Sequence, residues 1–143
     1  MLAQCAAFIG ERISHARQAI RQAQASANEE TKSSAGDKYE TGRAMAQLEI
    51  EKNRVQLAEA ERQMKILRAI DPDKAFQTAR EGSVVFTDRG NFFIAVAAGQ
   101  LTLNGERYMA VSSVSPIAGI FLNRAPGESV TFNTTAYLIE KIL

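Results

Sequence analysis

Apolar residues recur along the first part of the chain at alternating steps of four and three. The positions are Leu2, Ala6, Ile9, Ile13, Ala16, Ile20, Ala23 and Ala27. This heptad spacing puts every one of them on a single stripe of an α-helix, as in the helices of coiled coils. The pattern therefore predicts one long helix with a continuous apolar seam.

A second heptad series follows and ends just before Pro72, which cannot continue a helix. Between the two series the sequence KSSAGD, at residues 32–37, is rich in Ser and Gly and favours a turn. We therefore expect an antiparallel hairpin that bends near residues 33–37, with arms of roughly 45 Å at 1.5 Å per residue. Asn53 is the polar member of this second seam, where it can set the register of the two helices. The second series is Ala46, Ile50, Asn53, Leu57, Ala60, Met64 and Leu67.

The pattern changes near residue 80, where short runs rich in Val, Phe and Thr replace the helical spacing. Such runs predict strands that pair into an antiparallel sheet, and the pair Asn104-Gly105 is a strong hairpin signal. The predicted strands are 83–87, 91–97, 101–103 and 107–112.

The sequence SPIAGIFLN predicts a short buried helix, with Ser115 as its N-cap and Pro116 at its first position. A turn at residues 125–128 separates this helix from two further strand-like runs, SVTFN and AYLIEKIL. The predicted class is α+β. We expect a helical hairpin at residues 1–74, with its tip near 33–40, and a small sheet domain at 80–143.

Composition and charge narrow the range of functions. The chain has 143 residues, 45% of them hydrophobic, and a formal net charge of +1. This charge gives no general basis for DNA binding, so we expect any nucleic-acid contact to be local. No apolar run approaches the eighteen or so residues of a membrane span. The start reaches Glu11 and Arg12 too early for a signal peptide, and these features predict a cytoplasmic protein.

The cysteine and histidine content does not favour a disulfide, a metal site or a catalytic pair. Cys5 is the single cysteine and His15 the single histidine, so neither an internal disulfide nor a metal site of its own is expected. Ten residues separate them, which is about 15 Å along a straight helix, too far for a thiolate–imidazole pair. We expect no intrinsic cofactor, metal or small-molecule substrate.

Two stretches resemble a known family. They are MAVSSVSPIAGIFLNRAPGESVTF at residues 109–132, in which Val114 is an insertion, and GDKYE at residues 36–40. Both are similar to motifs of the bacterial Gre (GreA/GreB) transcript-cleavage and elongation factors. That family joins an N-terminal coiled coil to a domain of the FK506-binding-protein fold, in the same order of parts.

The resemblance implies that RNA polymerase is the partner and that the hairpin enters its secondary channel, close to the nascent RNA 3′ end. It implies that Asp37 and Glu40 help to hold a catalytic Mg²⁺ shared with the polymerase active centre, so that the chain is no independent enzyme. Oxygen ligands from one or two carboxylates suit this ion. It further implies that partner-binding residues lie in the second motif, namely Ser113, Ser115, Pro116 and Ile117.

Other interpretations of the tip remain open. By spacing alone, Asp37 caps the second helix and Glu40 closes a capping box. A rival alignment, anchored on Tyr39, places Lys32 and Ala35 at the acidic positions of the family's tip and leaves no carboxylate for cleavage.

Arg17 and Arg21 lie four residues apart on one face of the first helix, where they can meet acidic residues of the polymerase or RNA phosphates. Ion pairs with acids of the same chain, such as Glu11, are the simpler interpretation.

Three classes of function follow. The chain is a cleavage-stimulating factor, a non-cleaving regulator that occupies the same channel, or a peptide-binding module of the FK506-binding-protein type. The third class ranks last, because active isomerases of that fold use a pocket with Trp at its base and this chain has no Trp. Its phenylalanines are explained by a core, and fold alone is poor evidence for function.

Overall fold

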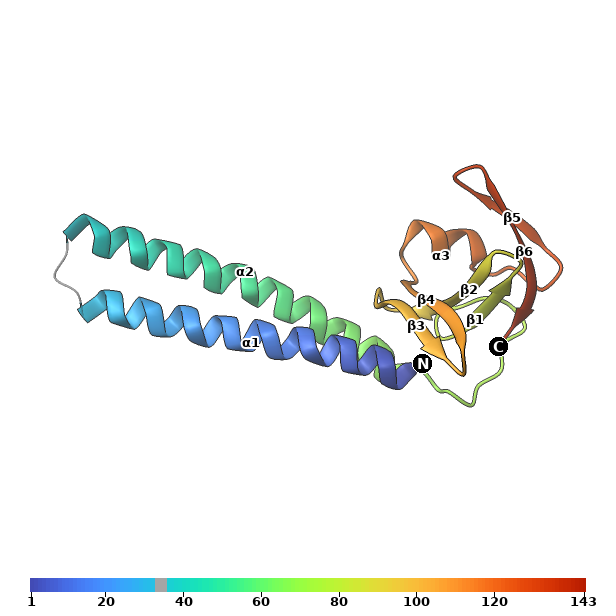
Figure 1. Cartoon of the computed structure of the whole chain (residues 1–143), viewed down its shortest axis with the longest axis horizontal. Coiled ribbons are helices and arrows are strands. Elements are labelled where there is room, and N and C mark those ends of the chain that lie inside the picture. The colour runs from blue at the N-terminus through green and yellow to red at the C-terminus, as the bar shows by residue number, and fades with distance from the viewer. Residues whose placement is uncertain (33–35) are drawn as a thin grey trace. The chain divides into compact units, whose positions relative to one another are not determined.

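The computed structural model describes the backbone of residues 1–32 and 36–143, and the side chains of residues 1–29 and 41–143. Two long helices come first and a six-stranded sheet with one short helix follows, which confirms the predicted α+β class (Figure 1). In chain order the elements are α1 (Leu2–Lys32), α2 (Gly36–Ala69), β1 (Val84–Thr87), β2 (Gly90–Ala95), β3 (Gly99–Leu103), β4 (Glu106–Ser112), α3 (Pro116–Phe121), β5 (Ser129–Phe132) and β6 (Thr135–Ile142).

The chain divides into two compact units. The hairpin unit is Ile9–Met64, and the sheet unit combines Met1–Phe8 with Lys65–Leu143. The predicted domains, 1–74 and 80–143, divide the chain by type of element, whereas these units divide it inside the two long helices. The sheet unit thus includes the first turns of α1 and the last turns of α2.

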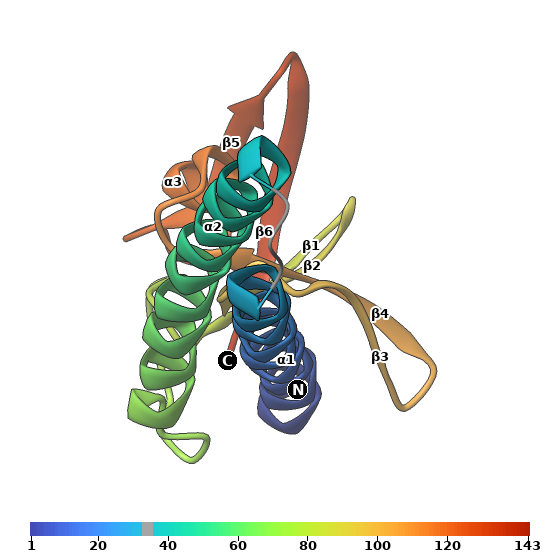
Figure 2. The ribbon, with the colours of Figure 1, turned by 90° about the vertical axis from the view of Figure 1, so that its left-hand side faces the viewer.

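In the hairpin unit, α1 and α2 lie side by side and run in opposite directions (Figures 1 and 2). The bend predicted near residues 33–37 lies largely outside the described residues. The buried side chains of this unit all belong to the two predicted seams, which confirms that the heptads face each other. Most are small, and they are Ile9, Ala16, Ala23 and Ala27 on α1, and Ala46, Ile50, Asn53 and Ala60 on α2.

Asn53 is 6% exposed and makes its hydrogen bonds within its own helix. Its Nδ2 donates to the backbone oxygen of Glu49 at 2.8 Å and to Glu49 Oε1 at 3.1 Å. The side-chain N–H groups are thereby satisfied without a partner on α1. A role in setting the register stays a prediction.

The sheet has the order β3-β4-β2-β1-β6-β5. Asn104 and Gly105 have φ of 52° and 81°, the left-handed values that a tight hairpin turn needs, so β3 and β4 pair as predicted. The expectation of a wholly antiparallel sheet is wrong at one place, because β2 and β4 run parallel, with Ile94 opposite Val111. The cause is that β3 does not pair with β2 but lies beyond β4 at the sheet edge, so β4 returns beside β2.

The core of the sheet unit lies between the sheet and α3. Phe121 and Ala118 of α3 are fully buried, as are Ile94 and Ile139 of the strands beneath. Phe121 lies 5.0 Å from Phe92, measured between ring centroids, an aromatic contact that adds to the apolar burial. These side chains fix α3 on the sheet and therefore fix the loop that precedes it.

The connection from α2 to β1 needs one glycine. Gly82 has a φ of 94°, which side chains rarely adopt, and a Cβ there would come within 3.2 Å of Ile70 Cγ2. Before it, the backbone of Ala79 forms two hydrogen bonds with the chain just after α3. Its oxygen accepts from Asn123 N at 2.8 Å, and its N donates to Arg124 O at 2.9 Å. The chain at the C-terminal end of α3 is thus held by backbone hydrogen bonds.

Candidate functional site

The loop between β4 and α3 is pinned by hydrogen bonds within itself. Ser115 N and Ser115 Oγ both donate to the backbone oxygen of Ser112, at 3.0 and 2.6 Å. Ser115 Oγ in turn accepts from Ala118 N at 3.3 Å, so it is the N-cap of α3, as predicted, with Pro116 next. Val114 N donates to Ser112 Oγ at 3.3 Å. The loop therefore holds one backbone conformation without help from a ligand.

The four residues predicted to bind a partner lie in different surroundings in the structure. Ser115 is engaged in the cap, and Ile117 packs against the core of the sheet unit. Ser113 Oγ donates to Glu81 Oε1 at 2.9 Å, on the surface. Pro116 is exposed. A partner would thus meet Pro116 and the Ser113–Glu81 pair directly, whereas Ser115 and Ile117 position the loop.

Val114 is the residue of this loop that the predicted site omits. Its side chain is 91% exposed, more than any other large hydrophobic side chain in the described part of the chain. The feature of the sequence that could have indicated this exposure is the insertion of Val114 into the motif. An apolar residue added between serines that hold the turn has no route into the core, so it projects into solvent.

Arg17 and Arg21 are both exposed on α1. Arg17 Nη2 donates to Glu61 Oε1 of α2 at 3.4 Å, and both side chains are about half exposed. This ion pair joins the two helices of the hairpin, and an exposed pair of this kind is worth at most about 1 kcal/mol. The simpler interpretation, a pair within the chain, fits Arg17, with Glu61 as the partner in place of Glu11.

The tip carboxylates belong to the first turns of α2, which begins at Gly36. The side chains of Asp37 and Glu40 lie outside the described residues, as does Ala35 of the rival alignment. Because α2 already begins at Gly36, Asp37 lies inside the helix and the prediction that it is the N-cap residue is wrong, while the metal-binding roles stay predictions.

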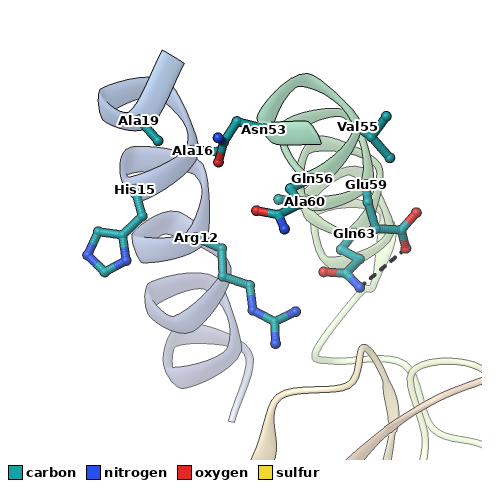
Figure 3. Close-up of a pocket in the computed structure, with 10 residues that line it drawn as sticks. All are labelled: Arg12, His15, Ala16, Ala19, Asn53, Val55, Gln56, Glu59, Ala60 and Gln63. Carbon is teal, nitrogen blue, oxygen red and sulfur yellow. Dashed lines mark hydrogen bonds between the residues drawn. The ribbon is translucent and has the colours of Figure 1, made fainter. Parts of the chain in front are cut away.

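A groove of about 650 Å³ opens between α1 and α2 in the hairpin unit (Figure 3). Ala16 and Ala60 line it, and side chains this small leave space between the helices. Arg12 and Gln63 extend into the gap, and His15 also lines the groove. Gln63 Oε1 is buried and accepts no hydrogen bond from the described residues, so a water molecule is its natural partner.

The described residues hold no group of three or more His, Cys, Asp or Glu side chains that could bind a metal ion. Cys5 is fully buried in the sheet unit, and this burial raises the pKa of its thiol, an effect that the nearby N-terminal charge partly offsets. Such a thiol is a weak nucleophile. None of the helices that the structure describes is both long and apolar enough to cross a membrane.

No protein-family model matches the sequence, and no curated protein matches it. Among solved structures, the chain is similar to that of the transcription factor Gfh1, with a TM-score of 0.39 and 17% sequence identity. The alignment covers 96% of this chain and 92% of that chain. A likeness of this size assigns no function, and the fold described above rests on the chain's own elements.

Proposed function

We propose that the chain is an accessory factor of RNA polymerase, which docks by its sheet unit and places its hairpin in the secondary channel. The observation that carries the proposal is the 109–132 sequence, which resembles the Gre family and contains the pinned loop before α3. Within that loop, Val114 and Pro116 are the exposed apolar side chains. An apolar projection that the protein already holds in place can bind a partner at small entropic cost.

The docking step is tested by measuring the affinity of the chain for core RNA polymerase, directly and by competition between variant and unmodified chains. Val114→Asp should weaken binding of the full chain by about tenfold or more, because it puts a charge where a partner's apolar pocket would close. Leu138→Asp is the matched control. Leu138 is 40% exposed on β6 of the same unit, outside the motif, and this variant should bind within about twofold of the unmodified chain. If the unmodified chain does not bind core polymerase, the proposed function is wrong.

We further propose that Asp37 and Glu40 act at the polymerase active centre, where they hold a Mg²⁺ ion together with the enzyme's own ligands. Mg²⁺ prefers carboxylate oxygens and keeps several waters, so the chemistry of the two donors suits it. The ion would activate the water that cleaves backtracked RNA. The chain itself contributes position and charge, and the reaction belongs to the polymerase.

Asp37→Asn removes the charge while keeping the size of the side chain in the first turn of α2. The variant should abolish stimulated RNA cleavage in backtracked complexes while leaving polymerase binding and thermal stability unchanged. Glu40→Gln is the companion variant, since it likewise removes a charge and keeps the size of the side chain. Equal cleavage by the Asn variant and the unmodified chain would contradict the catalytic role.

A second function is favoured by the alignment anchored on Tyr39, which puts Lys32 and Ala35 at the acidic positions of the tip. In that case the chain occupies the channel without stimulating cleavage, and it regulates by excluding other channel-binding factors. An unmodified chain that binds polymerase and yet stimulates no cleavage at any Mg²⁺ concentration would establish this function over the first.

A further inference from the structure

Glu81 lies in a tight turn of the sheet unit, just before β1. Ser83 closes the turn, because its N and its Oγ both donate to the backbone oxygen of Arg80, at 3.0 and 2.7 Å. Ser83 Oγ accepts from Arg80 N at 3.0 Å, and Gly82 N donates to Ile94 O of β2 at 2.7 Å. The backbone on both sides of Glu81 is therefore held, and its exposed side chain starts from a defined position.

The carboxylate of Glu81 is positioned by the loop between β4 and α3. Ser113 Oγ donates to Glu81 Oε1 at 2.9 Å, and the next residue is Val114, whose side chain is 91% exposed. Consecutive Cα atoms are only about 3.8 Å apart, so the carboxylate and the apolar projection belong to one small area of the surface. We call this area the docking surface, and it comprises Val114, Pro116 and the Ser113–Glu81 pair.

The charge of Glu81 is not neutralised within the chain. Among the cations that the structure describes, none forms an ion pair with it, including Arg80 just before it. Arg124, which follows α3, is paired with Glu128 instead, with 3.5 Å between Nη1 and Oε1. The two oxygens of a carboxylate offer about four lone-pair sites, and the hydroxyl of Ser113 takes one of them. The remaining acceptor capacity is open to a donor from a partner.

We propose that Glu81 is an anionic anchor of the docking surface, and that the polymerase segment bound there carries an arginine or lysine beside an apolar side chain. This inference rests on the proposed function, because it names the chemistry of the partner at the same site. Arginine fits best, since its planar guanidinium donates two parallel hydrogen bonds to a carboxylate. Glu81 fixes the direction of approach through this pair, and Val114 supplies the apolar contact.

The affinity of the full chain for core RNA polymerase, measured at several salt concentrations, tests the anchor. Glu81→Gln removes the charge but keeps an oxygen that can accept from Ser113, so the contact between the two turns is retained. We expect this variant to bind about fivefold or more weakly at low salt, and its affinity should fall less steeply with salt than that of the unmodified chain. Glu81→Arg should weaken binding by about thirtyfold or more, because it sets two cations against each other.

Two control variants separate charge from structure. Glu140→Gln makes the same change of charge on β6, beside Ile139, which pairs with Thr87 at the end of β1 far from Glu81. It should bind within about twofold of the unmodified chain and keep its salt dependence. Ser113→Ala keeps the charge but removes the hydroxyl that orients it, so we expect a loss of about twofold to threefold with unchanged salt dependence. Both Gln variants should melt like the unmodified chain, because both glutamates are exposed.

The results distinguish the anchor from the proposed function. A loss of affinity and of salt dependence in Glu81→Gln, but not in Glu140→Gln, supports the anchor. If the unmodified chain binds polymerase and Glu81→Gln binds equally well, or binds more weakly with the same salt dependence, the anchor is wrong and the proposed function stands. If the unmodified chain does not bind core polymerase, the proposed function is wrong and the anchor falls with it.

Discussion

The hairpin unit and the sheet unit achieve stability by opposite means. The hairpin buries mainly alanines along a narrow seam, with Ile9 and Ile50 as its large buried side chains. The sheet unit buries Phe121, Ile94 and Ile139 completely. Each helix of the hairpin satisfies its backbone locally, so a thin seam suffices to hold the arms together. Strands need partners far along the chain, and the apolar core must offset the entropy of bringing those partners together.

The surfaces of the two units differ in the same way. The hairpin unit exposes Met45, Leu48 and Val55 along a straight helix, as a stripe on α2. The sheet unit exposes Val114 at a single point, on a loop fixed by hydrogen bonds. A stripe suits the side-by-side packing of another helix, and a fixed point suits insertion into a pocket. The two surfaces therefore suit two different kinds of contact.

The largest expected effect is in the core of the sheet unit. Phe121→Ala removes a fully buried ring that contacts Phe92 and Tyr137, and it should lower the free energy of unfolding by about 3–5 kcal/mol. Phe132→Ala, at the half-buried end of edge strand β5, is the control and should cost less than half as much. Urea unfolding followed by circular dichroism measures both. A smaller loss at Phe121 than at Phe132 would show that α3 does not cover the core.

An intermediate effect is expected in the seam of the hairpin. Ile50→Ala removes a side chain that is 3% exposed and should cost about 2–3 kcal/mol, the low end for such truncations, because the narrow seam can close partly around the gap. Leu48→Ala, two residues earlier and 71% exposed, should change stability by no more than about 0.5 kcal/mol. Thermal melting of helicity compares them. Equal losses would mean that α2 does not pack on α1 by the predicted seam.

The smallest expected effect is at the cap of α3. Ser115→Ala removes the acceptor for Ala118 N and the donor to Ser112 O and should cost about 1 kcal/mol, while Ser115→Thr keeps a hydroxyl for both hydrogen bonds and should cost only a few tenths. Amide hydrogen exchange at Ala118 should accelerate in the Ala variant alone. Faster exchange throughout the sheet unit in both variants would indicate that the loop, and not the cap, supports α3.

Most of the local structure could be predicted from the sequence. The two heptad series, the left-handed turn at Asn104-Gly105 and the Ser115-Pro116 start of α3 were all predicted and are confirmed. In each case the cause lies in residues a few positions apart, such as an apolar period or a capping hydroxyl. The function of the tip could not be predicted in this way. Helix caps and metal ligands favour the same acidic residues, so by sequence Asp37 and Glu40 fit both roles.

What only the tertiary structure decided depends on residues far apart in the chain. The alternation of apolar and polar residues does not specify which strands become neighbours in a sheet. The parallel pairing of β2 with β4 was therefore not predicted. Ser113 meets Glu81 across 32 residues, and Arg17 meets Glu61 across 44. Nor does the sequence alone show that Val114 and the apolar stripe of α2 stay uncovered, because exposure depends on every other segment that could have packed there. Local chemistry thus determined the elements, and the competition among them for a common core decided which side chains remain free for a partner.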